Sequence, residues 1–278
     1  MRKIVVLGAK GMLGHELLKA FAGVHQVTAL DIDELDIFDL DATIGALQTL
    51  HPDLVIHSAA YTDVDGCELD PDKAHQVNAL GSRNVAIGCQ KTDAAMVYIS
   101  TDYVFNGQKT GPYQEWDTTG PINVYGTSKL AGENFVRSLC LRHYVVRTSW
   151  LYGRHGKNFV DTIARLARER DSLRVVVDQT GSPTWAHDLA DKIAELVRKE
   201  AYGTYHITNS DTCTWFQFAS EIVARMGLET RVEPVTSEQY VRPAKRPTNS
   251  VLDNYYLRLE GFSQMRSYRQ ALREYLKS

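Results

Sequence analysis

A tyrosine and a lysine stand four positions apart in the segment Tyr125-Gly126-Thr127-Ser128-Lys129. Residues at this spacing share one face of a helix, so the phenol and the ammonium would point the same way. A free tyrosine titrates near about pH 10 and a lysine near about pH 10.4, so at neutral pH the ammonium is charged and its field favours the phenolate. The pattern therefore predicts a tyrosine that exchanges a proton with a carbonyl oxygen.

A threonine is the third candidate for this chemistry. Thr101 follows an apolar run at 96–100, within Ser100-Thr101-Asp102-Tyr103-Val104-Phe105. Addition of a hydride to a ketone builds negative charge on the oxygen, and a hydroxyl fixed at that point lowers the barrier. A tyrosine and lysine at this spacing are common by chance, so the argument depends on the order of all three residues along the chain. We predict Thr101, Tyr125 and Lys129 as the catalytic residues.

A glycine-rich turn, Gly8-Ala9-Lys10-Gly11-Met12-Leu13-Gly14, directly follows the apolar run 3–7. Glycine permits a tight turn from strand to helix and lets the backbone approach a pyrophosphate, while the N-terminus of the next helix attracts the anion. Three glycines alone are a weak signal, but their place between a strand and an amphipathic helix favours dinucleotide binding. The predicted contacts are Gly8, Lys10, Gly11, Met12, Leu13 and Gly14.

Asp31 ends the second apolar run, seventeen positions after Gly14. An acidic residue in this place commonly reaches the adenosine ribose of a dinucleotide. Its carboxylate favours NAD by repelling a 2′-phosphate, but Lys10 could offset that effect, so the choice between NAD and NADP stays open. Asp36 and Ile37 are candidates for the adenine pocket, and the alternative for them is a loop acid before a core isoleucine.

The third apolar run ends in His57-Ser58-Ala59-Ala60-Tyr61. Ligands of doubly wound sheets lie at the carboxyl ends of the strands, and small residues there let a flat cofactor lie against the backbone. We therefore add Ala59, Ala60 and Tyr61 to the predicted cofactor site. No set of histidines and acids has a spacing that indicates a metal site, so no metal is predicted.

The elements that must position these residues form a regular pattern. Short apolar runs alternate with amphipathic segments of helix length, which is typical of βαβ units that build a parallel sheet. The predicted strands are 3–7, 26–30, 54–58, 96–100 and 144–147, and the predicted helices are 12–22, 42–50, 73–90 and 128–141. Right-handed crossovers make this a Rossmann-type, doubly wound α/β fold.

The alternation loosens after residue 150. Strands are predicted at 174–177 and 204–207, and helices at 158–170, 187–199 and 215–226. We expect residues 1–150 to form the dinucleotide-binding domain, to which segments near 173–210 return. Residues 151–278 are expected to form mainly a smaller, interleaved substrate-binding region.

Composition excludes several classes of protein. The chain has 278 residues, 44% of them hydrophobic, and no biased tract, as in ordinary globular proteins. A net charge of -3 gives no general attraction to nucleic acid or to anionic membranes, so neither is an expected partner. The apolar run near the N-terminus is too short for a signal peptide or a membrane span, which predicts a cytoplasmic protein. The four cysteines are far apart and are expected to be reduced thiols.

Together these motifs resemble the extended short-chain dehydrogenases/reductases and, among them, the dTDP-4-dehydrorhamnose reductase family, over nearly the full length. Further markers are Pro121-Ile122-Asn123-Val124-Tyr125-Gly126, Arg147-Thr148-Ser149-Trp150, Gly181-Ser182-Pro183-Thr184 and Arg246-Pro247 with Ser250. The resemblance implies hydride transfer from NADPH, with NADH possible, to the 4-keto group of dTDP-4-dehydro-6-deoxy-L-mannose (dTDP-4-dehydrorhamnose). The product would be dTDP-L-rhamnose, with its new proton supplied by Tyr125.

The resemblance also implies a substrate site. Its residues would be Val104, Phe105, Trp150, Asn158, Phe159 and Arg246. An indole face can pack on a deoxysugar ring, and the alternative for Trp150 is a plain core residue. Arg246, supported by Arg242 or Lys245, would bind the diphosphate, because a guanidinium holds phosphate oxygens through a planar fork.

One departure from the family concerns assembly. Some members dimerise around a magnesium ion held by glutamates, and Glu16 matches one such position. His187 stands at another, and histidine is a poor magnesium ligand. We therefore predict no structural magnesium, and a monomer or a homodimer.

Two other functions stay open at this point. Another nucleotide-sugar ketoreductase or an epimerase could share these motifs, and an epimerase would show no net oxidation of its cofactor. A non-catalytic, NADP-binding regulatory subunit is the alternative outside enzymes. The intact Thr101, Tyr125 and Lys129 argue against it, since pure binding does not require them.

Overall fold

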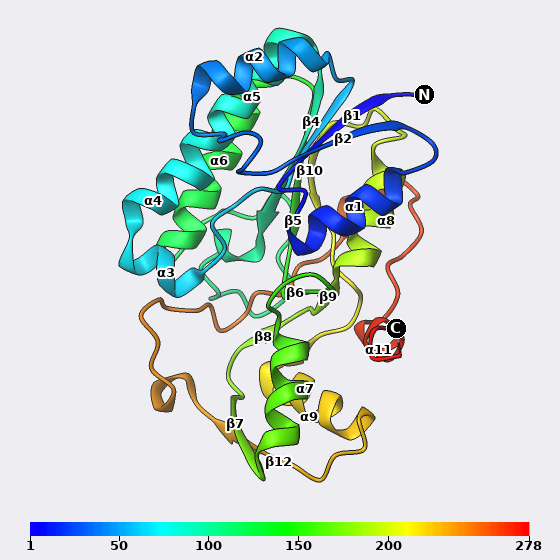
Figure 1. The fold of residues 1–278 in the computed structure, drawn as a ribbon. Coiled ribbons are helices and arrows are strands. Elements are labelled where there is room, and N and C mark those ends of the chain that lie inside the picture. The colour runs from blue at the N-terminus through cyan, green and yellow to red at the C-terminus, as the bar shows by residue number, and fades with distance from the viewer. Residues whose placement is uncertain (278) are drawn as a thin grey trace.

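The computed structural model describes residues 1–277, and its central element is a six-stranded parallel sheet in the order β10-β5-β4-β3-β1-β2 (Figure 1). The strands are β1 Lys3–Leu7, β2 Gln26–Leu30, β3 Leu54–His57, β4 Ala95–Thr101, β5 His143–Thr148 and β10 Gly203–His206. From β1 the chain adds β2 on one side and β3 to β10 on the other. The strand order therefore reverses between β1 and β3, which is where doubly wound sheets bind their ligands. The predicted Rossmann-type α/β fold is confirmed.

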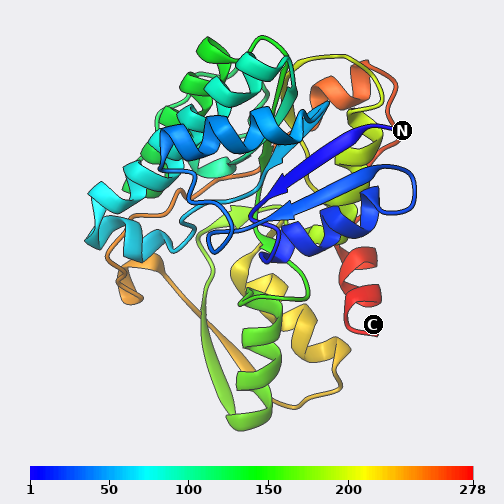
Figure 2. The ribbon, with the colours of Figure 1, turned by 45° about the horizontal axis from the view of Figure 1, so that its top comes forward.

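Helices cover both faces of the sheet (Figure 2). One face carries α1 Met12–Phe21 and α8 Ala186–Leu196, and the other carries α2 Leu40–Leu50, α5 Ser82–Thr92 and α6 Val124–Leu139. Alternate residues of a strand point to opposite faces, so Ile4 and Val6 pack under α1 while Val5 and Leu7 pack under α2. This double burial explains why the strands read as continuous apolar runs.

The helix predicted at 73–90 consists of three segments. These are α4 Pro71–His75, a π-helical turn over Gln76–Gly81, and α5, preceded by the short α3 Val64–Leu69. Turns of the π type are frequent at functional sites. Here the π turn carries Asn78, a buried residue that lies beside the predicted cofactor loop.

A smaller region hangs below the sheet in Figure 1. It contains α7 Phe159–Glu169, α9 Trp215–Arg225 and the parallel pair β7 Ser172–Val176 and β12 Arg231–Val235. The remaining elements are β6 Leu151–Tyr152, β8 Thr180–Gly181, β9 Thr184–Trp185, β11 Cys213–Thr214, α10 Tyr255–Leu259, α11 Tyr268–Tyr275 and 3-10 turns at Asp102–Val104 and Ser237–Gln239.

The two regions are interleaved along the chain. β10 joins the main sheet and α8 joins its helical layer. The strand β7 forms near its predicted place but pairs with β12 instead of returning to the main sheet. Its buried residues Leu173 and Val175 pack in the core of the smaller region, with α7 and α9, and this packing decides the partner.

Two further expectations concern the chain as a whole. Within residues 1–277, no helix is long and apolar enough to cross a membrane. The cysteines Cys67, Cys89, Cys140 and Cys213 are all buried and free. They therefore behave as small apolar core residues, as the sequence predicts.

The close contact of α6 with the π turn predicts a large effect of Gly132→Ala. A β-carbon there would lie 2.4 Å from the backbone oxygen of Asn78 and 2.3 Å from the hydroxyl of Tyr98. Such overpacking costs about 1–3 kcal/mol. Urea unfolding should show that loss, whereas Gly45→Ala, a helical site with open space around it, should be neutral or stabilising by about 0.5–1 kcal/mol. Equal stability of the two variants would contradict the packing described here.

Candidate active site

A cleft of about 430 Å³ opens at the carboxyl ends of the central strands. It brings the glycine turn together with the predicted catalytic residues, although the two are separated by more than eighty positions in the sequence. The predicted residues that line it are Gly8, Gly11, Met12, Leu13, Gly14, Ala60, Thr101, Tyr125, Lys129 and Trp150. The cleft thus lies at the point where the strand order reverses.

The glycine turn fits a pyrophosphate. Gly8 has a φ of 77°, and a β-carbon there would lie 2.6 Å from the backbone nitrogen of Ala59. Gly11 caps α1 without a side-chain hydrogen bond, and no acidic residue stands in the first turn of that helix. The first N–H groups of α1 are therefore open to an anion, and the helix dipole favours one.

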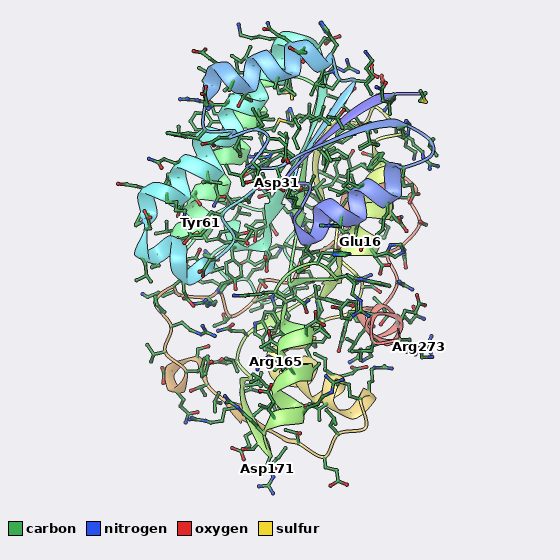
Figure 3. The ribbon with its side chains drawn as sticks, viewed as in Figure 1. Glu16, Asp31, Tyr61, Arg165, Asp171 and Arg273 are labelled. Atoms are coloured by element: carbon green, nitrogen blue, oxygen red, sulfur yellow. The ribbon has the colours of Figure 1, made fainter. Side chains whose placement is uncertain are left out.

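Asp31 lies at the end of β2, next to the glycine turn (Figure 3). One of its oxygens accepts a hydrogen bond of 2.7 Å from the backbone nitrogen of Lys10. The ammonium of Lys10 turns to Asp33 and Glu34, at 2.7 and 3.0 Å, and hydrogen bonds to these carboxylates raise the pKa of Lys10. Lys10 is thus paired with acids and does not line the cleft, which limits how far it can offset Asp31.

Tyr125 and Lys129 lie on one face of α6. Asn123 caps the start of this helix, because its side-chain oxygen accepts a hydrogen bond of 2.8 Å from the backbone nitrogen of Gly126. Burial raises the pKa of Tyr125 well above its ordinary value. Burial lowers the pKa of Lys129 to about 7, against an opposing effect of Glu133. The ammonium nitrogen lies 4.2 Å above the ring of Tyr98.

This electrostatic state corrects the sequence argument. We expected a fully charged lysine whose field favours the phenolate form of the tyrosine and so lowers its pKa. Burial disfavours the charged form of both groups, so Tyr125 is a phenol at neutral pH and Lys129 titrates there. A protonated phenol is the form that can donate a proton to a developing alkoxide, so the arrangement suits reduction of a carbonyl.

The hydroxyl of Thr101 is hydrogen-bonded to a buried acid. It donates to Asp102 at 2.9 Å and accepts from the backbone nitrogen of Tyr103 at 3.2 Å. Hydrogen bonding to Thr101 partly offsets the raised pKa of Tyr125. Burial raises the pKa of Asp102 to about 7, against the opposing effect of hydrogen bonds to Ser250 and Thr101. The sequence prediction missed Asp102, although it lies within the marker segment that contains Thr101.

A larger cavity of about 1040 Å³ lies beside the cleft, in the smaller region. Tyr103 and Trp215 line both spaces. The charged residues that line the larger cavity are Arg170, Arg174, Glu238, Arg242, Lys245 and Arg246. This excess of cations, beside the apolar side chains of α7 and β7, suits a ligand that combines phosphate with a flat ring.

Arg246 lines this cavity and already forms an ion pair with an aspartate. Its guanidinium donates to Asp65 at 2.6 Å, and Arg242 contacts the same carboxylate at 3.2 Å. Asp65 belongs to α3, whose first residue Val64 lines the cofactor cleft. The ion pair therefore connects the cofactor side of the molecule with the cavity of the smaller region.

Trp150 lines the cleft in a strained conformation, with a φ of 46°. Its ring stacks on Trp215 with a centroid distance of 3.5 Å and an angle of 4° between the planes. One face of Trp150 is therefore covered by another indole, so that face is closed to a sugar ring. The sequence prediction missed Trp215, because nothing in the sequence links positions 150 and 215.

Val104 and Phe105 are corrections to the predicted substrate site. Both are fully buried in an apolar cluster with Tyr113 and Leu252. The ring of Phe105 stacks on Tyr113 at 4.2 Å. The 3-10 turn Asp102–Val104 directs these side chains beneath the strand end, and they line neither cavity.

The predicted neighbours on α7 have different surroundings. Asn158 is buried and caps the helix by accepting from the nitrogen of Asp161 at 2.9 Å, while its amide donates to the oxygen of Gly153 at 2.8 Å. It lines neither cavity, since its polar atoms serve the cap. Phe159 lines the larger cavity.

Six predicted cofactor residues line neither cavity: Lys10, Asp31, Asp36, Ile37, Ala59 and Tyr61. Ile37 packs in the core beneath α2, and the exposed Asp36 accepts from the nitrogen of Phe38, so the alternative of a loop acid before a core isoleucine describes them. Ala59 packs against Gly8. The backbone of Tyr61 pairs with the side chain of Asn78, at 2.8 and 3.0 Å.

Asn78 is a positioning residue that the sequence prediction missed. Its amide also donates to Ser128 at 3.0 Å, so one side chain joins the cofactor loop to α6. Its position in a π turn could not be recognised from helical periodicity.

Glu16 is buried on α1 (Figure 3) and contacts Lys19 at 2.9 Å and His187 at 3.5 Å. His187 also approaches Asp191 at 3.5 Å. Within residues 1–277, no group of three or more histidines, cysteines or acids is placed to hold a metal ion. The absence of a structural magnesium stays a prediction.

Fold and cleft together define a class of protein. A doubly wound parallel sheet whose glycine turn faces a threonine, a tyrosine and a lysine is typical of nicotinamide-dependent short-chain dehydrogenases/reductases. The model of one family, described as the RmlD substrate binding domain, matches residues 1–278. The chain belongs to this family.

Individual relatives are similar over nearly their whole length. The spore coat polysaccharide biosynthesis protein SpsK of Bacillus subtilis is 42% identical, covering 100% of this chain and 98% of that protein. A dTDP-4-dehydrorhamnose reductase of Aggregatibacter actinomycetemcomitans is 39% identical over 91% of each chain. The crystal structure of dTDP-4-dehydrorhamnose reductase from Bacillus anthracis in complex with NADP superposes with a TM-score of 0.97, at 42% identity and 99% coverage of both chains.

The raised pKa of Asp102 predicts a pH-dependent effect on stability. Its proton is bound more tightly in the folded than in the unfolded chain, so its contribution is fully present below its ordinary pKa of 3.8 and is lost as the pH rises through about 7. The stability of Asp102→Asn relative to wild type should therefore increase across this range, by at most about 4 kcal/mol. Urea unfolding at a series of pH values measures it.

The matched control is Asp171→Asn, a change at an exposed aspartate at the tip of the smaller region (Figure 3). Its stability relative to wild type should stay constant with pH. A difference between Asp102→Asn and wild type that is equally constant would contradict a buried, titrating Asp102.

Proposed function

We propose that this protein is a dTDP-4-dehydrorhamnose reductase that reduces the 4-keto group of dTDP-4-dehydro-6-deoxy-L-mannose to give dTDP-L-rhamnose. One observation carries the proposal: the cleft lined by Thr101, Tyr125 and the glycine turn adjoins a cavity rich in arginine, with which it shares Tyr103 and Trp215. Such a site places a carbonyl beside a proton donor while cations hold a diphosphate. The names of the relatives support this substrate.

The residues of the chain supply the proton and the orientation. A reduced nicotinamide bound in the cleft supplies the hydride that adds to C4 of the sugar. Tyr125 donates its hydroxyl proton to the carbonyl oxygen, so the ketone becomes an alcohol and Tyr125 becomes a phenolate. Thr101 stabilises that phenolate by hydrogen bonding. The ammonium form of Lys129, one helical turn away on α6, would stabilise it through its charge.

NADPH is the proposed cofactor, with NADH as second choice. The relative from Bacillus anthracis contains NADP. Asp31 opposes a 2′-phosphate, but one of its oxygens is engaged by the backbone of Lys10 and the other by the backbone of Ile32. Comparison of kcat/KM for the two cofactors decides the preference.

The proposed reaction indicates where in the cell the protein would act, and the site indicates which oligomeric states are compatible with activity. Nucleotide sugars and reduced nicotinamide are made in the cytoplasm, so the protein would act there. The cleft contains all three catalytic residues within one chain, so a monomer and a homodimer are both compatible with activity.

The direct test supplies dTDP-4-dehydro-6-deoxy-L-mannose with NADPH and follows the loss of absorbance at the wavelength of the reduced nicotinamide. The reductase consumes one NADPH for each dTDP-L-rhamnose formed. An epimerase would convert the sugar without net oxidation of NADPH, and a regulatory subunit would bind NADPH without turnover. Either result would refute the proposal.

Tyr125→Phe removes the proton donor and leaves the ring in place. We expect kcat to fall by at least roughly a hundredfold, the scale of general acid catalysis. The affinity for NADPH, measured by fluorescence titration, should change little. Turnover near that of wild type would exclude Tyr125 as the proton donor.

Arg246→Met tests the diphosphate contact. Loss of one charge-assisted contact that is equally strong in the ground state and the transition state raises KM and leaves kcat nearly unchanged. We expect KM for the nucleotide sugar to rise about tenfold, which corresponds to roughly 1.4 kcal/mol. Arg165→Met, at an exposed arginine of α7 paired with Glu169 (Figure 3), is the control and should leave KM unchanged. An equal effect of both changes would refute a specific role of Arg246.

A further inference from the structure

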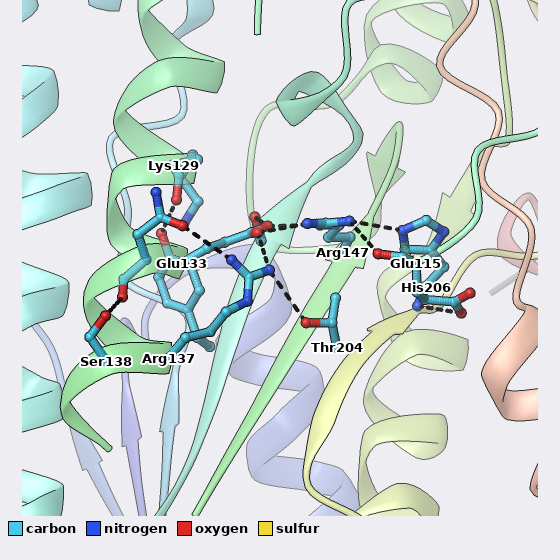
Figure 4. A network of polar contacts seen from close by, with 11 residues as sticks. Glu115, Lys129, Glu133, Arg137, Ser138, Arg147, Thr204 and His206 are labelled. Carbon is cyan, nitrogen blue, oxygen red and sulfur yellow. Dashed lines mark hydrogen bonds and ion pairs between the residues drawn. The ribbon is translucent and has the colours of Figure 1, made fainter. Parts of the chain in front are cut away.

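A fully buried carboxylate lies one helical turn after Lys129 on α6. Glu133 accepts two hydrogen bonds of 2.9 Å from Arg147, one of 2.6 Å from Arg137 and one of 2.5 Å from the hydroxyl of Ser100 (Figure 4). Four donor atoms from three elements therefore converge on one side chain.

These contacts connect the elements that form the catalytic site. Glu133 extends from the helix that carries Tyr125 and Lys129. Ser100 directly precedes Thr101 at the end of β4, and Arg147 precedes Thr148 at the end of β5. Thr101 and Thr148 both belong to the ends of strands that meet at the cleft. The relative position of the proton donor and the threonine thus depends on this carboxylate.

Glu133 is also the main source of negative charge for the buried ammonium of Lys129. The titratable groups around Lys129 come from β3, α3 and β4. Burial lowers the pKa of His57 to about 3, raises that of Cys67 to about 11 and raises that of Tyr98 well above its ordinary value, so all three are neutral at pH 7.

Tyr125, on the same helix as Lys129, is also neutral at pH 7, because burial keeps it a phenol. Glu133 differs, because Arg147 and Arg137 hold its pKa below the ordinary value despite burial. Its charge raises the pKa of Lys129 against the effect of burial. The ionised Glu133 therefore favours the ammonium form of Lys129 at neutral pH.

A buried ion pair is weak evidence for stability, because desolvation of the charges offsets most of their attraction. A purely structural link between α6 and the two strands could be made by apolar packing. The presence of a charged residue at position 133 is explained if the electric field of Glu133 acts on a group that must be cationic during turnover.

We propose that Glu133 is a positioning residue for the reductase reaction, acting through Lys129 by its charge and through Ser100 by its geometry. The inference rests on the proposed function for its kinetic part. Its electrostatic part concerns Lys129 alone and needs no substrate.

The experiment compares Glu133→Gln with wild type by two measurements. Lysine labelled with ¹³C at Cε reports the titration midpoint of Lys129 by NMR, with the signal assigned from Lys129→Met. We expect the midpoint in Glu133→Gln to fall by at least about one pH unit, a tenfold weaker binding of the proton. The kcat for the keto sugar should fall at least tenfold at pH 7, and its decline with rising pH should begin at a correspondingly lower pH.

Glu133→Asp keeps the charge but shortens the side chain, and it should leave the midpoint near that of wild type while kcat falls because the contact with Ser100 lengthens. This variant decides the matter if Glu133→Gln does not fold. Glu169→Gln, which removes an exposed acid from a helix, should change neither quantity.

A folded Glu133→Gln with an unchanged midpoint would overturn the proposal, as would a Glu133→Asp variant that shifts the midpoint or keeps the full kcat. The NMR titration also separates this proposal from the proposed function. If the wild-type protein does not reduce the keto sugar, the proposed function fails, while the titration still decides whether Glu133 controls the charge of Lys129.

Discussion

The charge of Lys129 is buried, and much of the catalytic site follows from how the fold accommodates it. The ammonium lies against the ring of Tyr98 at the bottom of a cleft, with an ionised carboxylate one turn away on its own helix. Burial alone would leave this lysine largely neutral at physiological pH. The position of α6 across the ends of β4 and β5 is therefore an electrostatic arrangement as well as a packing arrangement.

The second feature of the molecule is the boundary between the main sheet with its helices and the smaller region. Tyr103 and Trp215 line both the cofactor cleft and the larger cavity, and Asp65 holds Arg246 across the same boundary. In the proposed reaction, the reacting carbon of the substrate would lie where the two spaces adjoin, with the nicotinamide in the cleft and the cations on the other side. The strained, stacked Trp150 forms part of this meeting point.

A Rossmann fold by itself supports many reactions, so the fold does not define the substrate. The features that indicate a particular reaction are in the site. It combines a phenol that stays protonated, a threonine hydrogen-bonded to a buried acid, and a basic cavity beside them. The RmlD substrate binding domain family, to which the chain belongs, includes the whole chain from residue 1 to 278. The chemistry of the chain and its relatives thus lead to the same class of reaction.

The sequence by itself determined the local elements and was sufficient to predict a catalytic set. The apolar runs at β1 and β2 were located to the residue, and the order of the glycine turn, Thr101, Tyr125 and Lys129 was sufficient to predict a dinucleotide-dependent reaction. These signals are local, because strand periodicity, turn glycines and helical spacing are set by neighbouring residues.

Only the tertiary structure decided burial and long-range partners. It placed Phe105 in a core cluster, paired Trp150 with Trp215, and showed that burial raises the pKa of Tyr125 and lowers that of Lys129. Each outcome depends on which distant segments exclude water from a side chain, and that exclusion is a property of the packed fold and not of the spacing of residues along the chain.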